Sequence, residues 1–95
     1  MVKVNIKFSA MIKNITDTDA AAVDVDGGTV NDLLAALIRQ YGAQFEKRII
    51  DEKTGKLRRF VNIFVNGRDI RNLQGPDTKL NAGDEVRLIP TVAGG

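Results

Sequence analysis

The chain has 95 residues, and its 14 lysine and arginine side chains against 12 aspartates and glutamates leave a net charge of only +2. This length suits one domain with a single hydrophobic core, and so small a surplus of positive charge argues against a dedicated nucleic-acid-binding protein. The sequence lacks cysteine and histidine, which excludes disulfides and thiolate nucleophiles and removes the commonest general base and metal ligand. We therefore expect a substrate or partner of other proteins rather than an enzyme, with no catalytic residue and no metal site of its own.

The sequence contains no apolar run long enough to cross a bilayer, and it does not open with a basic segment followed by an apolar one. Neither a membrane span nor a signal peptide is therefore visible. We expect a cytoplasmic protein that does not associate with membranes.

The first part of the chain predicts two strands. Apolar and polar residues alternate strictly over residues 2–9, which is typical of a strand with one buried face. Residues 10–19 are rich in polar side chains, and we expect them to form a turn. A second short strand is predicted at 21–25, and a hairpin is the simplest connection between two consecutive strands.

A helix is predicted after the glycine pair at 27–28. Thr29 with Asp32 three residues later resembles a capping box, and apolar residues recur with helical spacing over the next three turns. Gly42 stands where a C-terminal cap favours a left-handed residue, and residues 43–50 are compatible with a short second helix. A glycine pair before a helix can also cradle an anion, but a turn followed by a cap is the favoured interpretation, because no phosphate-binding lysine motif accompanies it.

The segment 47–59 is the most basic part of the chain. Acidic residues are interspersed among its lysines and arginines, and such a mixed run is usually a solvated face. Docking of a partner protein is the alternative that we keep open for this segment, and RNA binding is less favoured.

The strongest strand pattern covers residues 57–66. Asn66-Gly67 then predicts a tight reversal, because both residue types tolerate a positive φ. The remaining elements are, in order, a brief strand at 68–70, a turn-rich connection at 72–77, an isolated core residue at Leu80 and a last strand at 85–89.

One good helix and a sheet with one covered face predict a two-layer α+β domain. The alternation along the first, third and last strands selects the residues that should face the helix. These inward-facing residues are Val4, Ile6, Phe8, Val61, Ile63, Val65, Val86 and Leu88.

The same alternation leaves Phe60, Phe64 and Ile89 on the uncovered face of the sheet. They would lie near each other if the third and last strands are neighbours, and an apolar patch at this place is typical of a docking surface. The alternative is that Phe60 and Phe64 are buried under residues 43–56.

The end of the chain reads as an extended tail. Pro90 has no backbone N–H and cannot donate to a sheet, so it marks the place where strand pairing fades. We expect residues 1–91 to form the domain and 92–95 to form a flexible tail that presents the carboxylate of Gly95. The tail consists of Val92, Ala93, Gly94 and Gly95.

Three segments carry a resemblance to a known family: residues 59–66 (RFVNIFVN), residues 83–90 (GDEVRLIP) and the VAGG ending at 92–95. Through them the chain resembles the MoaD/ThiS superfamily of ubiquitin-like sulfur carrier proteins, and within it the CysO-type carriers of cysteine biosynthesis. The similarity follows the order of elements along the whole chain. It implies a β-grasp fold, in which a four- to five-stranded mixed sheet packs one main helix on one face.

The resemblance also implies a chemistry for Gly95. An E1-like enzyme would use ATP to adenylate its carboxylate, and sulfur would then convert the adenylate to a thiocarboxylate. A carboxylate is an anion at neutral pH and a poor electrophile, so an acyl adenylate supplies the leaving group that sulfur can displace. The chain itself would bind no cofactor, since the partner enzyme uses the ATP.

The implied partners are an E1-like adenylyltransferase or sulfurtransferase and a downstream sulfur acceptor. The acceptor would be a pyridoxal-phosphate-dependent, cysteine-synthase-like enzyme or the large subunit of molybdopterin synthase. Candidate docking residues are Phe60, Phe64, Ile89 and Pro90, and Ile89 falls where relatives use an apolar contact to the activating enzyme.

Three alternatives to this carrier role remain open. The chain would be a ubiquitin-like modifier joined through Gly95 to lysines, the small subunit of molybdopterin synthase, or an interaction domain with an inert tail. The first two use the same activated tail as the carrier, so the sequence barely separates them from it.

Overall fold

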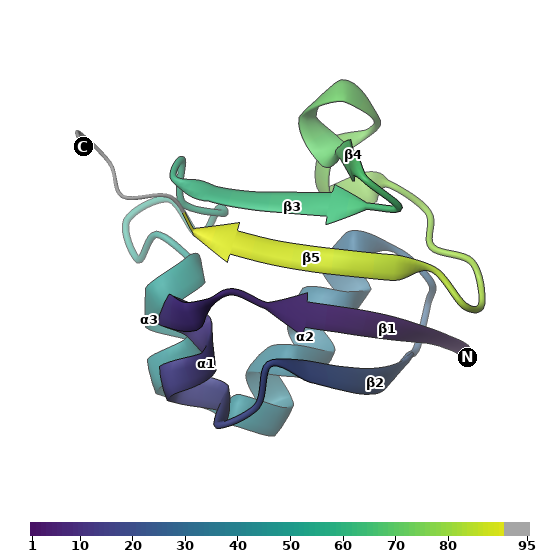
Figure 1. Cartoon of the computed structure of the whole chain (residues 1–95). Coiled ribbons are helices and arrows are strands. Elements are labelled where there is room, and N and C mark those ends of the chain that lie inside the picture. The colour runs from purple at the N-terminus through teal and green to yellow at the C-terminus, as the bar shows by residue number, and fades with distance from the viewer. Residues whose placement is uncertain (91–95) are drawn as a thin grey trace.

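Five strands form one mixed sheet in the order β2-β1-β5-β3-β4 (Figure 1). The computed structural model describes residues 1–90, and for residues 10 and 11 the backbone alone. The central pair β1 and β5 is parallel, and the other neighbours are antiparallel. The strands are β1 (Val2–Phe8), β2 (Ala20–Val25), β3 (Val61–Val65), β4 (Arg68–Asp69) and β5 (Glu85–Pro90).

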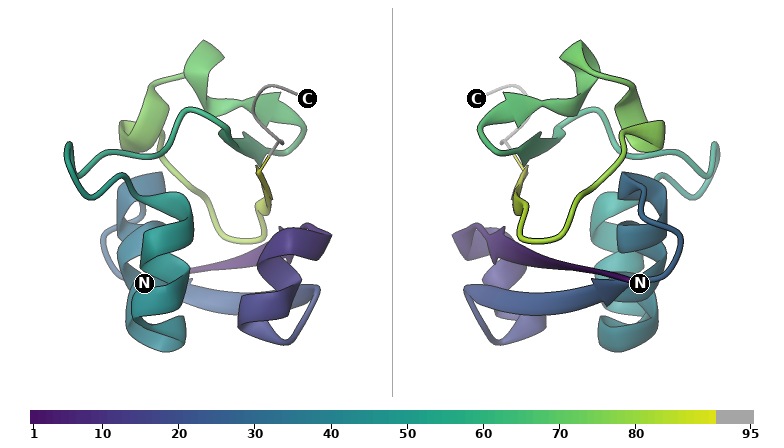
Figure 2. Two further views of the ribbon diagram at one scale, coloured as in Figure 1. Left: turned by 90° about the vertical axis from the view of Figure 1, so that its left-hand side faces the viewer. Right: turned by 90° about the vertical axis from the view of Figure 1, so that its right-hand side faces the viewer.

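The helices α2 and α3 lie together on one face of this sheet, as Figures 1 and 2 show from three directions. None of the helices within residues 1–90 has the length and apolar character needed to traverse a bilayer. The helical elements are α1 (Ala10–Thr16), α2 (Val30–Tyr41), α3 (Ala43–Ile49) and the two 3-10 turns η1 (Ile70–Asn72) and η2 (Gly75–Asp77).

The main helix α2 begins at the predicted capping box. The Asp32 N–H donates to Thr29 Oγ1 (3.2 Å), and the Thr29 N–H donates back to Asp32 Oδ2 (3.1 Å). At the other end the Gly42 N–H donates to the Ile38 carbonyl (2.8 Å) with φ at +87° and ψ at −164°. Gly42 therefore has the predicted positive φ but not the left-handed helical ψ, because it is also the N-cap of α3. The presence of α3 confirms the predicted second short helix.

The prediction of a turn at residues 10–19 was wrong, because α1 occupies most of this segment. Ile12 is fully buried and anchors the helix to the core. A left-handed residue, Asp17 with φ at +61°, ends it. Strands β1 and β2 still pair in antiparallel fashion, but through this helix rather than through a tight hairpin.

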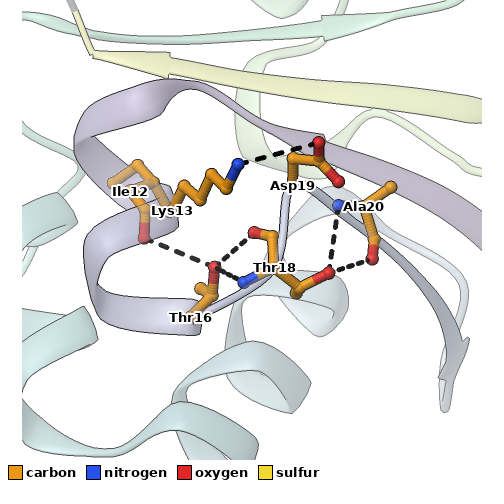
Figure 3. Close-up of polar contacts among 6 residues, drawn as sticks. All are labelled: Ile12, Lys13, Thr16, Thr18, Asp19 and Ala20. Carbon is orange, nitrogen blue, oxygen red and sulfur yellow. Dashed lines mark hydrogen bonds and ion pairs between the residues drawn. The ribbon is translucent and has the colours of Figure 1, made fainter.

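Polar contacts after α1 fix the entry into β2 (Figure 3). The hydroxyl of Thr16, which is almost completely buried, donates to the Thr18 carbonyl (2.8 Å) and lies 3.4 Å from the Ile12 carbonyl. The hydroxyl of Thr18 donates in turn to the carbonyl of Ala20 at the start of β2 (2.8 Å). Side-chain hydrogen bonds, rather than a tight backbone turn, thus hold the segment between α1 and β2.

The third strand is shorter than predicted. It begins at Val61, whose N–H donates to the Arg58 carbonyl (3.0 Å) and so closes a turn immediately before the strand. Leu57 forms only an isolated bridge with Ile50. The alternation of sheet faces therefore does not extend back to Phe60, and the assignment of that residue to the outer face fails for this reason.

The elements after β3 agree closely with the prediction. Asn66 (φ +52°) and Gly67 (φ +84°) form the tight reversal between β3 and β4. The predicted brief strand ends one residue early, because Ile70 is buried as the first residue of η1. The turn-rich segment 72–77 contains the end of η1 and all of η2, and Leu80 is a core residue that is 4% exposed.

The core lies between the sheet and the helices. Apolar residues of α2 and α3 meet the inward face of the sheet, as the alternation predicts. All eight residues predicted to face inward are buried, namely Val4, Ile6, Phe8, Val61, Ile63, Val65, Val86 and Leu88.

Candidate functional site

The sheet face opposite α2 and α3 carries two apolar side chains close together. In the register of β3 and β5, Asn62 lies opposite Ile89 and Phe64 lies opposite Arg87. Phe64 and Ile89 are therefore diagonal neighbours on one face, within reach of each other's side chains. Both are partly exposed and line one shallow hollow of about 500 Å³. The structure thus brings together two of the predicted docking residues, and we call this pair and its surroundings the outer face.

Phe60 does not belong to the outer face. It packs against the edge of the core, beside Ile15 of α1 and Lys47 of α3. The cause is the turn before Val61, which takes Phe60 out of the strand. The alternative of burial near residues 43–56 thus describes Phe60 in part, but it does not describe Phe64.

Pro90 is the last described residue of β5 and lies opposite Val61. It is buried, so it does not form part of an exposed docking surface, contrary to the prediction. Pro90 still shares the end of β5 with Ile89, whose side chain points the other way.

Charged residues that the sequence analysis did not single out surround Ile89 and Phe64. Lys7 of β1 lies opposite Arg87 of β5 because these two strands pair in parallel. Glu85 lies between them, 3.5 Å from the ammonium of Lys7 and 3.6 Å from Nε of Arg87. Alternation along β1 and β5 could have placed Lys7, Glu85 and Arg87 on the outer face. Only the strand order shows that Lys7 is a neighbour of the other two.

Asn66 holds the reversal next to Phe64 in place. Its side-chain carbonyl accepts from the Glu85 N–H (3.0 Å), and its amide donates to Asp84 Oδ1 (2.9 Å). The backbone N–H of Asn66 donates to the Glu85 carbonyl (2.8 Å). These bonds tie the turn to the start of β5 and fix the position of Phe64 relative to Ile89.

The outer face has the composition of a binding surface. An apolar centre with a charged rim is the usual anatomy of a protein–protein interface. Within residues 1–90 no three acidic side chains gather to form a metal site. The described geometry supports recognition of another protein surface through Phe64, Ile89 and their charged neighbours.

The predicted tail lies outside the described residues. This applies to Val92, Ala93, Gly94 and Gly95 and to the predicted domain boundary after residue 91. The roles assigned to these residues therefore stay predictions.

A five-stranded mixed sheet in this order, with a main helix on one face, defines a β-grasp, ubiquitin-like protein. The structure is similar to the crystal structure of SAMP1 from Haloferax volcanii, with a TM-score of 0.83, 31% identity and coverage of 98% of this chain and 99% of that one. It is also similar to a chain of the crystal structure of the Amycolatopsis orientalis BexX/CysO complex, with a TM-score of 0.77, 28% identity and coverage of 97% and 99%. These similarities confirm the predicted fold.

The sequence comparisons identify the family. The ThiS family matches residues 6–95. A provisionally named sulfur carrier protein of Archaeoglobus fulgidus is 45% identical over 73 residues, which cover 77% of this chain and 81% of the relative. The sulfur carrier protein CysO of Mycobacterium tuberculosis is 38% identical over 74 residues, which cover 78% and 80%.

The chain belongs to the ThiS family and is a sulfur carrier protein. Proteins of this kind are not themselves catalysts, which agrees with the expectation drawn from the missing cysteine and histidine. The resemblance to the MoaD/ThiS superfamily that the sequence predicted is confirmed.

Proposed function

We propose that the carboxylate of Gly95 is the group that this carrier loads with sulfur. An E1-like enzyme binds the outer face, and the Gly95 carboxylate attacks the α-phosphorus of ATP and releases pyrophosphate. A sulfur nucleophile then displaces AMP from the acyl adenylate and leaves a thiocarboxylate. The observation that carries this proposal is the Phe64–Ile89 pair on the outer face, because Ile89 lies on β5, the last strand before the tail residues in the sequence.

The energetics of the tail explain why a docking face on the body is needed. Glycine lacks a Cβ and adopts backbone conformations closed to other residues, so it can pass through a narrow channel. Ordering four tail residues costs about 1–2 kcal/mol each, or about 4–8 kcal/mol in all. Contacts made by the tail alone can hardly offset this cost. Phe64 and Ile89 are already partly buried, so covering their exposed parts adds some fraction of the ~1.5–3 kcal/mol that full burial of each side chain would give.

The relatives support one proposal for the downstream acceptor. Similarity to CysO favours sulfur transfer to a pyridoxal-phosphate-dependent, cysteine-synthase-like enzyme, and the A. orientalis relative forms a complex with BexX. The large subunit of molybdopterin synthase is the other acceptor that we consider. We place the cycle in the cytoplasm, where ATP is available to the activating enzyme.

A second candidate function is protein modification. The chain is similar over nearly its whole length to SAMP1, a small archaeal modifier protein. The same adenylate of Gly95 would then end in an isopeptide bond to a lysine. One activated tail can serve both roles, so the products distinguish them.

The test is an intact mass measurement of the native protein. We expect a fraction that is heavier by one oxygen-to-sulfur exchange at the C-terminus. Lysine-linked ladders under denaturing conditions would instead favour the modifier. Identification of the copurifying partner, a pyridoxal-phosphate enzyme or a molybdopterin synthase subunit, assigns the acceptor.

A variant with one residue appended after Gly95 tests the assigned atom. We expect it to lose sulfur loading completely while its thermal unfolding stays unchanged, because the carboxylate is displaced and the domain is untouched. Lys53→Gln, an exposed change in the loop after α3, serves as the control that loads normally. Retained loading of the extended variant would overturn the assignment of Gly95.

A further inference from the structure

A second concave surface lies on the other side of the sheet from the outer face. It is a cavity of about 750 Å³, bordered by the first turns of α2, the loop after α3, β3 and the turns η1 and η2. Figure 2 shows these segments gathered on one side of the molecule, beside α2. Its volume falls in the range of ligand and side-chain pockets. We call it the edge cavity.

Apolar side chains form the floor of the edge cavity. Val61 and Ile63 reach it from the inward face of β3, and Leu34 reaches it from α2. Ile50 and Leu57, which are partly buried, close the side under the loop. An apolar side chain from outside would therefore contact hydrocarbon here.

The rim of the edge cavity is strongly cationic. Four basic side chains line it, and Asp69 is the one carboxylate among the lining residues. The carboxylate of Asp69 already binds Arg71. It accepts a hydrogen bond from the backbone N–H of Arg71 (2.9 Å) and lies 4.0 Å from the Arg71 guanidinium. The basic side chains are Lys56, Arg58, Arg59 and Arg71.

Two of these cations are already engaged, and two are available. Arg58 donates from Nε to the Lys47 carbonyl (3.0 Å), and Arg71 donates to Asn62 Oδ1 and to the Arg59 carbonyl (both 2.6 Å). Within residues 1–90 the ammonium of Lys56 and the guanidinium of Arg59 have neither a hydrogen bond nor an ion pair. The chain has a net charge of only +2, so this local excess of positive charge is pronounced.

The cavity also adjoins an open sheet edge. β3 pairs with β5 from Val61 to Val65, but with β4 only at Phe64 and Val65. Along the remaining edge the guanidinium of Arg71 donates to the Val61 carbonyl (3.2 Å). A side chain, rather than a strand, thus occupies the edge beside the cavity, and this is one way in which proteins protect edges from unwanted pairing.

We propose that the edge cavity docks a polypeptide segment of a partner protein that carries an apolar anchor residue next to carboxylates. The apolar floor takes the anchor, and Lys56 and Arg59 pair with the carboxylates. Charge complementarity favours an acidic partner, because such charges speed association and exclude basic competitors. A cavity open along a sheet edge suits a chain that enters and leaves it better than a small molecule that must be enclosed.

This surface goes beyond the loading of the tail and does not depend on it. Phe64 and Ile89 lie on the opposite face of the sheet, so a partner in the edge cavity leaves the outer face uncovered. One protein could then hold the carrier while another acts on its tail.

The test uses a capped acidic pentapeptide, Asp-Glu-Leu-Asp-Glu, titrated into the full-length protein and followed by the chemical shifts of backbone amides. We expect shifts concentrated at residues 56–63 and 70–76, with affinity that falls as salt is added. Lys56→Gln and Arg59→Gln should each weaken binding about two- to fivefold, as expected for partly exposed ion pairs. Lys53→Gln, in the same loop but outside the cavity lining, is the matched control and should bind as wild type.

Three results of the peptide titration would overturn the proposal. They are equal binding of a peptide with serine in place of leucine, shifts centred on Phe64 and Ile89, and unchanged affinity in the Lys56→Gln, Arg59→Gln double variant. Binding of dodecanoate without binding of the peptide would assign the cavity to a small molecule and would also overturn it. The variant extended beyond Gly95 should still bind the peptide, which separates this test from that of the tail.

Discussion

The two faces of the β3–β5 pair consist of alternate residues of the same two strands, yet they differ in almost every physical property. On the inner face Val61, Ile63 and Leu88 are at most 1% exposed and lie in the core. On the outer face Phe64 and Ile89 are partly exposed within a charged rim. The comparison teaches that one short segment can hold the domain together and present a binding surface, because a strand sends successive side chains in opposite directions.

Ile63→Ala should produce the largest loss of stability. It removes a buried side chain from the inner face and leaves a void, so the free energy of unfolding should fall by about 2–5 kcal/mol. Urea denaturation measures the change. Ile63→Val is the matched control, for which we expect a loss of about 0.5–1.5 kcal/mol. Equal effects of the two substitutions would mean that Ile63 is not closely packed.

Phe64→Asp, unlike Ile63→Ala, should impair activation and leave the stability of the domain nearly unchanged. We expect activation by the E1-like enzyme to weaken about tenfold or more, because an apolar contact at the centre of an interface is replaced by a charge. The free energy of unfolding should change by less than about 1 kcal/mol, since the side chain is only partly buried. Enzyme-dependent adenylation and thermal unfolding measure the two effects.

Phe64→Leu, which keeps the contact apolar, serves as the control and should largely retain activation. If Phe64→Asp unfolds the domain, the division of the two strands into a structural face and a binding face is wrong at this position.

Thr29→Ala probes the helix that covers the inner face. The substitution removes the side-chain acceptor for the Asp32 N–H, and such caps contribute about 1 kcal/mol. Chemical denaturation should show this loss, whereas Thr29→Ser should retain most of the stability because serine caps equally well. Loading of the tail should be unaffected at temperatures where the domain is folded.

Glu85→Gln should have the smallest effect. Its carboxylate pairs with Lys7 and Arg87 on the outer face, where all three side chains are about half exposed. Such pairs contribute between about 0 and 1 kcal/mol and weaken with salt. Unfolding at low and high salt should show a small difference from the wild type that disappears at high salt. A loss above 2 kcal/mol would mean that the outer face is structural after all.

Local patterns accounted for most of the elements. The capping box at Thr29 and the reversal at Asn66-Gly67 could be predicted because each depends on residues that are close together in sequence. The helix α1 could not, because Asn14 and Thr16 have low helix propensity and favour a turn interpretation, and so short a helix needs contacts from outside itself. Burial of Ile12 against the core stabilises it, and this contact is not visible in the sequence.

The candidate site was only half predictable. Alternation placed Phe64 and Ile89 on one face correctly, and it misplaced Phe60 because the strand begins one residue later, at Val61. The edge cavity was even less predictable from the sequence, because the basic residues of its rim lie in a mixed-charge segment that is typical of a solvated loop. Its walls come from α2, β3 and the turns after β4, which are far apart along the chain.

Apolar periodicity and turn chemistry were enough to show an α+β domain and its inward-facing residues. The segments 59–66, 83–90 and 92–95 separately carried a family resemblance that reaches the last residue, Gly95. Strand order, and with it the neighbours Lys7 and Arg87, emerged only from the folded chain. The physical reason is the distance along the chain over which each interaction acts. Backbone preferences and side-chain alternation act over a few residues, whereas the pairing of β1 with β5 joins segments near opposite ends of the chain, and burial of a shared core selects that pairing.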